Sequence, residues 1–211
     1  ALDEEQIRDI NKEYEYKLNL LNRKEDVIRL IDEKGLLTEE LRQDILKAEK
    51  LIDVEDFYRP FKEKKKTKAT IAVKQGLKPL ADYISTYPLE GSLEVKAEEF
   101  LTDEVTSIEQ AIEGATFIIA EEISDSSDYR KWIRNNTYNN GTIQSKIKKN
   151  AKDEMDTYEM YHDYEDRLNK VKLYRALALN RAEKEKVLNV KIVVEAEKIH
   201  QYLEKQIIKD H

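Results

Sequence analysis

The residues best suited to chemistry form a basic cluster between positions 59 and 68. This ten-residue segment holds six basic side chains against a single acid, Glu63. The six are Arg59, Lys62, Lys64, Lys65, Lys66 and Lys68. Such side chains contact the phosphates of RNA or DNA without reading their sequence, although a lysine run is also typical of a solvated surface. The cluster is therefore a candidate nucleic-acid-binding site in a chain whose net charge is -7.

No other group of residues is arranged as in an enzyme or a metal site. The chain has no cysteine and only three histidines, and it lacks a glycine-rich phosphate loop and an H-E-x-x-H motif. His162 stands near Glu159, Asp163 and Asp166, but such a histidine is more often a surface residue than a metal ligand. We therefore predict a protein that is not an enzyme, with no cofactor, metal ion or small-molecule substrate. No apolar run approaches the ~20 residues of a membrane span, so we expect a cytoplasmic protein without a membrane partner.

The elements that position the cluster are predicted to be helices. Only five glycines and three prolines occur in 211 residues, so few residues would break a helix. Alternating β-branched residues at 187–194 predict at most one short strand, whose pairing partner would lie upstream, in another chain or in another domain. The expected fold is all-α, an extended assembly of eight to eleven helices with helical hairpins.

Local signals divide this helical chain. Gly35 suits the left-handed residue that ends a helix, and Thr38 can cap the next helix, so the two helices should form a hairpin. A loop is expected at 86–93, which contains Pro and Gly. We divide the chain there into a hairpin region with the basic connector, 1–85, and a second helical region, 86–211.

Apolar spacing predicts the core. Apolar residues recur every three or four positions, as on one face of a helix, at Ile7, Ile10, Tyr14, Leu18 and Leu21. The residues expected to be buried are Leu18, Leu21, Ile28, Leu41, Ile45, Ile71, Leu80, Ile118, Trp132 and Leu177. Tyr158, Tyr161 and Tyr164 are three residues apart, which indicates a helical stripe that packs rather than one that stacks on bases. Lys64 and Lys65 are expected to be exposed and to contribute little to stability.

A long pattern at 51–81 carries a family resemblance. It reads LIDVEDFYRPFKEKKKTKATIAVKQGLKPLA and resembles the LEDLY-PYK-KRRTKA-IA--KGLEPLA pattern of the Tex family, which are bacterial transcription accessory proteins. Shorter blocks at 36–41, 111–121 and 158–164 are similar to the same family. The block at 173–188 resembles the family's SHRALALLRGEKEGVL.

That last block also departs from the family pattern. Tyr174 replaces its histidine, Ala182 replaces its glycine, and Val171 and Lys172 replace the preceding PS. If those positions support an interface to the next domain, that interface is built differently here.

The resemblance implies a function that depends on a longer protein. It implies that the chain is the N-terminal helical region of a Tex-like protein, without the ribonuclease-H-like, helix-hairpin-helix and RNA-binding OB-fold domains. On this interpretation it is a non-catalytic scaffold of a bacterial transcription accessory protein. The full-length protein would bind RNA or DNA, and this part would contact nucleic acid weakly through 62–68. The alternative is a protein–protein interaction module that docks downstream domains or the transcription machinery.

Overall fold

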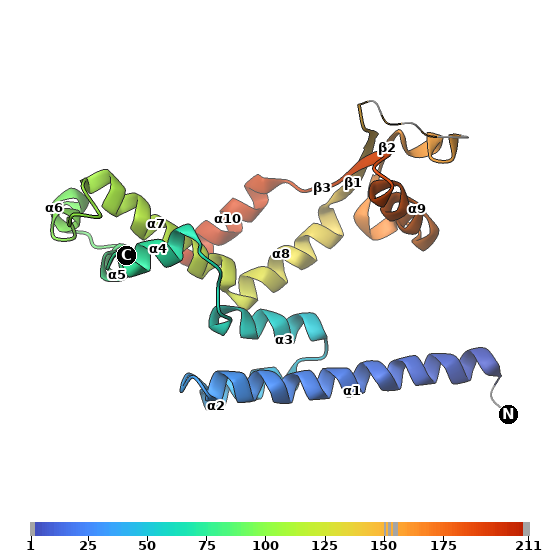
Figure 1. Cartoon of the computed structure of the whole chain (residues 1–211), viewed down its shortest axis with the longest axis horizontal. Helices are drawn as coiled ribbons and strands as arrows, with labels where there is room; N and C mark the ends of the chain where they lie inside the picture. The colour runs from blue at the N-terminus through green and yellow to red at the C-terminus, as the bar shows by residue number, and fades with distance from the viewer. Residues whose placement is uncertain (1–2, 150, 152, 154–155, 209–211) are drawn as a thin grey trace. The chain divides into compact units, whose positions relative to one another are not determined.

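The computed structural model describes residues 3–149, 151, 153 and 156–208. In this part of the chain there are ten α-helices and one three-stranded sheet (Figure 1). The prediction of a mainly helical protein is therefore confirmed. The chain divides into two compact units, residues 1–130 and 131–211, and each is described by itself.

The first unit begins with a layer of three helices. These are α1 (Glu4–Asp32), α2 (Glu39–Lys47) and α3 (Leu51–Tyr58). Gly35 adopts a left-handed conformation with φ of 69°, so the chain turns back after α1. The side chain of Thr38 then accepts a hydrogen bond from the backbone N–H of Leu41 at 3.2 Å. The predicted hairpin and its cap are both confirmed.

The core of this layer uses only part of the apolar surface of α1. Its fully buried residues are Val27, Ile31, Ile45 and Val54, and Ile28 and Leu41 pack half-buried around them. Leu18 and Leu21 are 44% and 51% exposed, so their predicted burial is wrong. At 100° per residue, the stripe they share lies about 120° around α1 from the face that meets α2 and α3. A regular apolar spacing identified the helix but not the face that is covered.

A second layer of the first unit is formed by short helices packed on a long one. Its elements are η1 (Arg59–Phe61), α4 (Lys68–Lys74), α5 (Lys78–Ser85), α6 (Leu93–Glu98) and α7 (Ile108–Asp125). Leu80 and Ile118 are buried as predicted, whereas Ile71 is 36% exposed because α4 faces α7 through alanines. The layer is close-packed at Gly114, where an added Cβ would overlap the side chain of Leu77. Small residues thus bring α7 next to the turn between α4 and α5.

The sequence-based division at 85 differs from this division into units. Helices α4 and α5, which lie before the division, share one core with α7, which lies after it. The loop expected at 86–93 is present, since no helix is formed between α5 and α6. Helix α8 (Ser127–Asn140) follows α7 and runs across the boundary between the units.

The second unit contains a sheet that the sequence did not predict in full. Its strands are β1 (Thr142–Ile147), β2 (Asp163–Arg167) and β3 (Leu188–Val193), in the antiparallel order β2-β1-β3. Strand β3 confirms the strand expected at 187–194, and it pairs upstream, with Ile192 opposite Ile143. The prediction of at most one strand was wrong, because β1 and β2 are too polar to show an alternating pattern of apolar residues.

Helices and aromatic residues complete the second unit. Its remaining elements are η3 (Glu159–Tyr161), η4 (Leu168–Lys170), α9 (Leu173–Lys184) and α10 (Ala196–Ile207). Tyr158 and Tyr161 are buried, so they pack as predicted, but they belong to short turns and strand β2 follows, not a helical stripe. Trp132 is half-buried and stacks on Tyr202 with 3.7 Å between ring centroids. Leu177 is 60% exposed, contrary to prediction, because α9 contacts β3 through another face.

Candidate nucleic-acid interface

The basic cluster spans η1, the connector at 62–67 that follows it, and Lys68, the first residue of α4. Pro60 stands in the first turn of η1, where its fixed backbone is tolerated. The connector ends at Thr67, whose hydroxyl accepts the backbone N–H of Thr70 at 3.0 Å and so caps α4. The Thr67 hydroxyl also donates to Glu121 of α7 at 3.0 Å. The connector is therefore tied at its end both to α4 and to α7.

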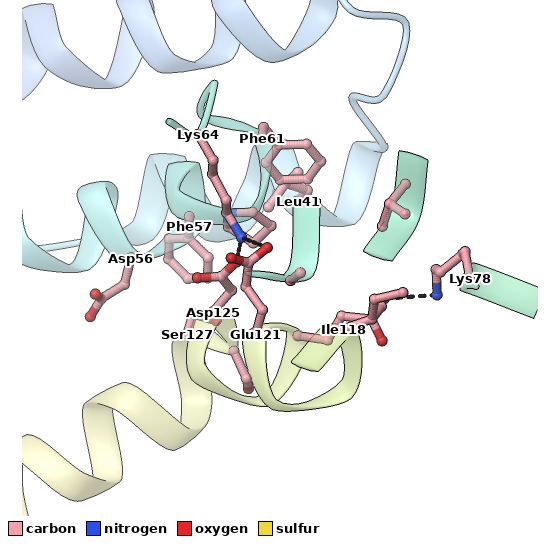
Figure 2. A pocket seen from close by; sticks show the side chains of 15 residues that line it. Leu41, Asp56, Phe57, Phe61, Lys64, Lys78, Ile118, Glu121, Asp125 and Ser127 are labelled. Carbon is pink, nitrogen blue, oxygen red and sulfur yellow. Dashed lines mark hydrogen bonds and ion pairs between the residues drawn. The ribbon is translucent and has the colours of Figure 1, made fainter. Parts of the chain in front are cut away.

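Two of the six cations form ion pairs with α7. The Nε of Arg59 donates to Oδ1 of Asp125 at 2.8 Å. The ammonium of Lys64 contacts Oδ2 of Asp125 and lies 2.9 Å from Oε2 of Glu121 (Figure 2). Asp125 is only 5% exposed, so its carboxylate needs these two cations as partners. Arg59 and Lys64 are thus engaged within the protein.

The environment of Lys64 favours its charged form. Partial burial alone would lower the pKa of this amine, but the hydrogen bonds to Asp125 and Glu121 outweigh that effect, so the pKa of Lys64 is raised. Its side chain is 24% exposed. The expectation that Lys64 is an exposed residue is therefore wrong, because a residue 61 positions away pairs with it.

The other four cations remain at the surface. Lys68 places its ammonium 4.4 Å from the ring centroid of Phe117, a cation–π contact. Lys62, Lys65 and Lys66 are exposed and make no ion pair with any residue that the structure describes. These three lysines are the part of the predicted site that is open to phosphates.

A second ion pair joins α3 to the start of α8 within the first unit. Asp56 is 4% exposed, and its Oδ1 accepts from the Nε of Arg130 at 2.6 Å. Arg130 also donates to the backbone carbonyl of Ser124 at 3.4 Å. Sequence reasoning did not identify these paired acids. One signal could have found Asp125 on α7, since it follows Ile118 by seven residues and continues the buried face of that helix.

A cavity of about 610 Å³ lies beside these ion pairs. Apolar residues of both layers line it, among them Leu41, Phe57, Phe61 and Ile118 (Figure 2). Its charged residues are already paired, as with Lys78 and Glu122 at 2.7 Å. Within the described residues, no three His, Cys, Asp or Glu side chains are grouped to hold a metal ion.

A smaller cavity of about 500 Å³ lies along the connector itself. Arg59, Lys62, Lys64 and Lys65 line it, together with the carboxylates of Glu63, Glu121 and Asp125. Lys62 and Lys65 are the lysines of this group that no described carboxylate neutralises. The arrangement can hold an anion at its rim.

Comparisons with known proteins identify relatives of this chain. Residues 90–211 match the family model described as Tex central region-like. Bacillus subtilis (strain 168) protein YdcI is 50% identical over 213 residues, which cover 100% of this chain and 30% of YdcI. The transcriptional accessory protein Tex of Neisseria gonorrhoeae is 30% identical over 90% of the chain and 25% of that protein. Escherichia coli (strain K12) protein YhgF is 28% identical over 91% of the chain and 25% of YhgF.

The chain spans less than a third of the length of these relatives. Among the helices that the structure describes, none is both long and apolar enough to cross a membrane.

Proposed function

Because this chain belongs to the family defined by the Tex central region-like domain, we propose that it is a non-catalytic helical scaffold within a transcription accessory protein. The name of the relative from Neisseria gonorrhoeae, transcriptional accessory protein Tex, supports the transcriptional role. The full-length protein would act on RNA or DNA, together with the transcription machinery, in the cytoplasm of a bacterium.

Weak contact with nucleic acid through the connector is part of the proposal. The observation that carries it is the exposure of Lys62, Lys65 and Lys66 without an intramolecular ion pair among the described residues. Three phosphate contacts give weak, sequence-independent binding, with a dissociation constant of about 10⁻⁴–10⁻⁶ M. A net charge of -7 repels the same polyanion elsewhere on the chain. The interaction would therefore assist a stronger site in the longer protein.

Arg59 and Lys64 have a different role in this proposal. Their pairing with Asp125 fixes the connector against α7, so the neighbouring lysines are presented from a defined backbone. Substituting Lys64 would mainly change the stability of the fold. A binding test that includes Lys64 would therefore mix a loss of stability with a loss of phosphate contacts.

Docking of a protein partner is the second candidate function, and one observation favours it. Helix α1 exposes a continuous apolar stripe outside the core of its layer, formed by Ile7, Ile10, Tyr14, Leu18 and Leu21. Exposed stripes of this kind mark protein interaction surfaces. A binding test that fails on nucleic acid would favour this candidate.

The test compares two matched triple variants by fluorescence anisotropy with a labelled 20-mer oligonucleotide. One carries Lys→Gln substitutions at 62, 65 and 66, and the control carries them at 12, 17 and 47, all of which are exposed. The first should lower the slope of log K against log salt by about 2–3, since each phosphate contact contributes about 0.7–0.9. The control should bind like the parent. Equal slopes for the connector variant and the parent would refute the proposed contact.

A further inference from the structure

Helix α9 has an exposed face that its own unit leaves uncovered. Leu173 is 77% exposed, Tyr174 62% and Leu177 60%. At 100° per residue these three side chains share a sector of about 100° with Arg181 and Lys184, which are also exposed. The buried residues of α9, Leu179 and Ala182, lie on the opposite side. The face is thus apolar and aromatic at its first turns and basic at its last.

The segment that carries this face is strongly basic in sequence. Residues 167–186 hold seven basic side chains and two acidic ones, Glu183 and Glu185. Six of the seven are exposed and make no ion pair with any described residue: Arg167, Lys170, Lys172, Arg181, Lys184 and Lys186. Glu185 accepts a hydrogen bond from the hydroxyl of Tyr158 at 2.8 Å. Uncompensated cations are therefore more numerous here than on the connector of the first unit.

The seventh cation holds the exposed aromatic ring. Arg175 donates from Nε to the hydroxyl of Tyr174 at 3.2 Å, and from Nη1 to the hydroxyl of Tyr164 at 3.3 Å. Its Nη1 also lies 3.5 Å from Oδ2 of Asp166 on strand β2. Arg175 thus connects the ring of Tyr174 to the sheet, while more than half of that tyrosine stays open to solvent. The ring is held in place before anything binds to it.

We propose that this face of α9 is a binding surface for single-stranded nucleic acid, with Tyr174 as a stacking platform and the surrounding lysines and arginines as phosphate contacts. A polyanion matches the cations, and its unpaired bases match Tyr174 and the two leucines. The helix is about 18 Å long, which places Lys172 and Lys184 far enough apart to contact different phosphates. A duplex keeps its bases stacked inside and would leave the apolar residues without a partner. This surface uses other residues than the connector, so substitutions can test the two proposals independently.

The test uses the whole chain and a labelled 12-mer of oligo-dT and of oligo-rU, with the matching duplexes as competitors. Tyr174→Ala should weaken single-strand binding about five- to 150-fold, the loss of one stacked base. Tyr174→Phe keeps the stacking ring and loses only the hydrogen bond from Arg175, so it should bind much closer to the parent than Tyr174→Ala does. The Arg181→Gln/Lys184→Gln double variant should lower the salt slope by about 1.4, whereas Lys12→Gln/Lys17→Gln on α1 should leave it unchanged. Circular dichroism of each variant checks that the helices persist.

The outcomes separate the proposals. Loss of binding with Tyr174→Ala and the 181/184 variant, but not with the variant at 62, 65 and 66, supports the α9 surface and refutes the connector. The reverse pattern overturns the α9 proposal and leaves the connector. Equal affinity of Tyr174→Ala and parent, a preference for duplex, or no binding at millimolar oligonucleotide would each overturn the α9 surface. Under the last outcome an apolar and basic face of this kind would be assigned to a protein partner.

Discussion

Replacing Asp125 by alanine should destabilise the first unit. The substitution removes the acceptor of both Arg59 and Lys64 from a site that is 5% exposed. A hydrogen bond to a charged group contributes about 1.5–3 kcal/mol, which sets an upper range of about 3–6 kcal/mol for two. The cations can partly rehydrate, since their side chains are 47% and 24% exposed, and Lys64 keeps Glu121. We therefore expect a loss of about 2–3 kcal/mol in the free energy of unfolding.

Urea denaturation followed by circular dichroism measures this loss. Glu113→Ala is the matched control, because Glu113 is an exposed acid of the same helix and its loss should cost less than about 0.5 kcal/mol. A double-mutant cycle with Lys64→Ala should give a coupling energy of about 1 kcal/mol or more. If Asp125→Ala were as stable as Glu113→Ala, or the cycle gave no coupling, the ion pairs would not hold the connector on α7.

Three further predictions concern packing and pH. Leu80→Ala should cost about 2–5 kcal/mol and Leu177→Ala less than about 0.5 kcal/mol in the same denaturation assay, because only Leu80 is buried. Gly114→Ala should lower the thermal midpoint, since the new Cβ overlaps Leu77 and overpacking costs about 1–3 kcal/mol, more than the helix propensity that alanine gains. The folded-state pKa of Lys64 lies above its usual 10.5, so its ion pairs stabilise the fold in full below that pH and are lost as the pH rises through the folded value. Denaturation between pH 9 and pH 12 should therefore show a smaller alkaline loss in Lys64→Met than in the parent.

The helix boundaries could be predicted because the signals that set them are local. Thr38 caps a helix with its own side chain, and Gly35 adopts a conformation that its lack of Cβ makes easy. The sheet depends instead on pairing between β1 and β3, whose partners Ile143 and Ile192 are far apart in sequence. Strand β1 reads TIQSKI, which carries too few apolar residues to reveal a buried face. Non-local pairing is what local patterns cannot show.

Non-local contacts also decide which residues of the candidate site are available. Composition located the basic cluster, but which cations stay open depends on Asp125, 66 residues from Arg59 and 61 from Lys64. The stripe on α1 is another case, since apolar spacing shows that a helix is amphipathic without showing whether a partner covers it. Residues such as Leu18 were expected inside and lie outside. The six basic residues look alike in the sequence. In the structure Arg59 and Lys64 pair with α7, and the other four lie at the surface.

A residue-resolved titration tests the central claim most directly. In ¹⁵N-labelled protein, the backbone amides are followed by NMR while a single-stranded 12-mer is added. The proposed function predicts shifts at Lys62, Lys65 and Lys66 that saturate between about 10⁻⁶ and 10⁻⁴ M and vanish at high salt, while the amides of Asp125 and Glu121 stay in place. Unchanged connector lysines at millimolar oligonucleotide, or shifts centred on Asp125, would contradict it.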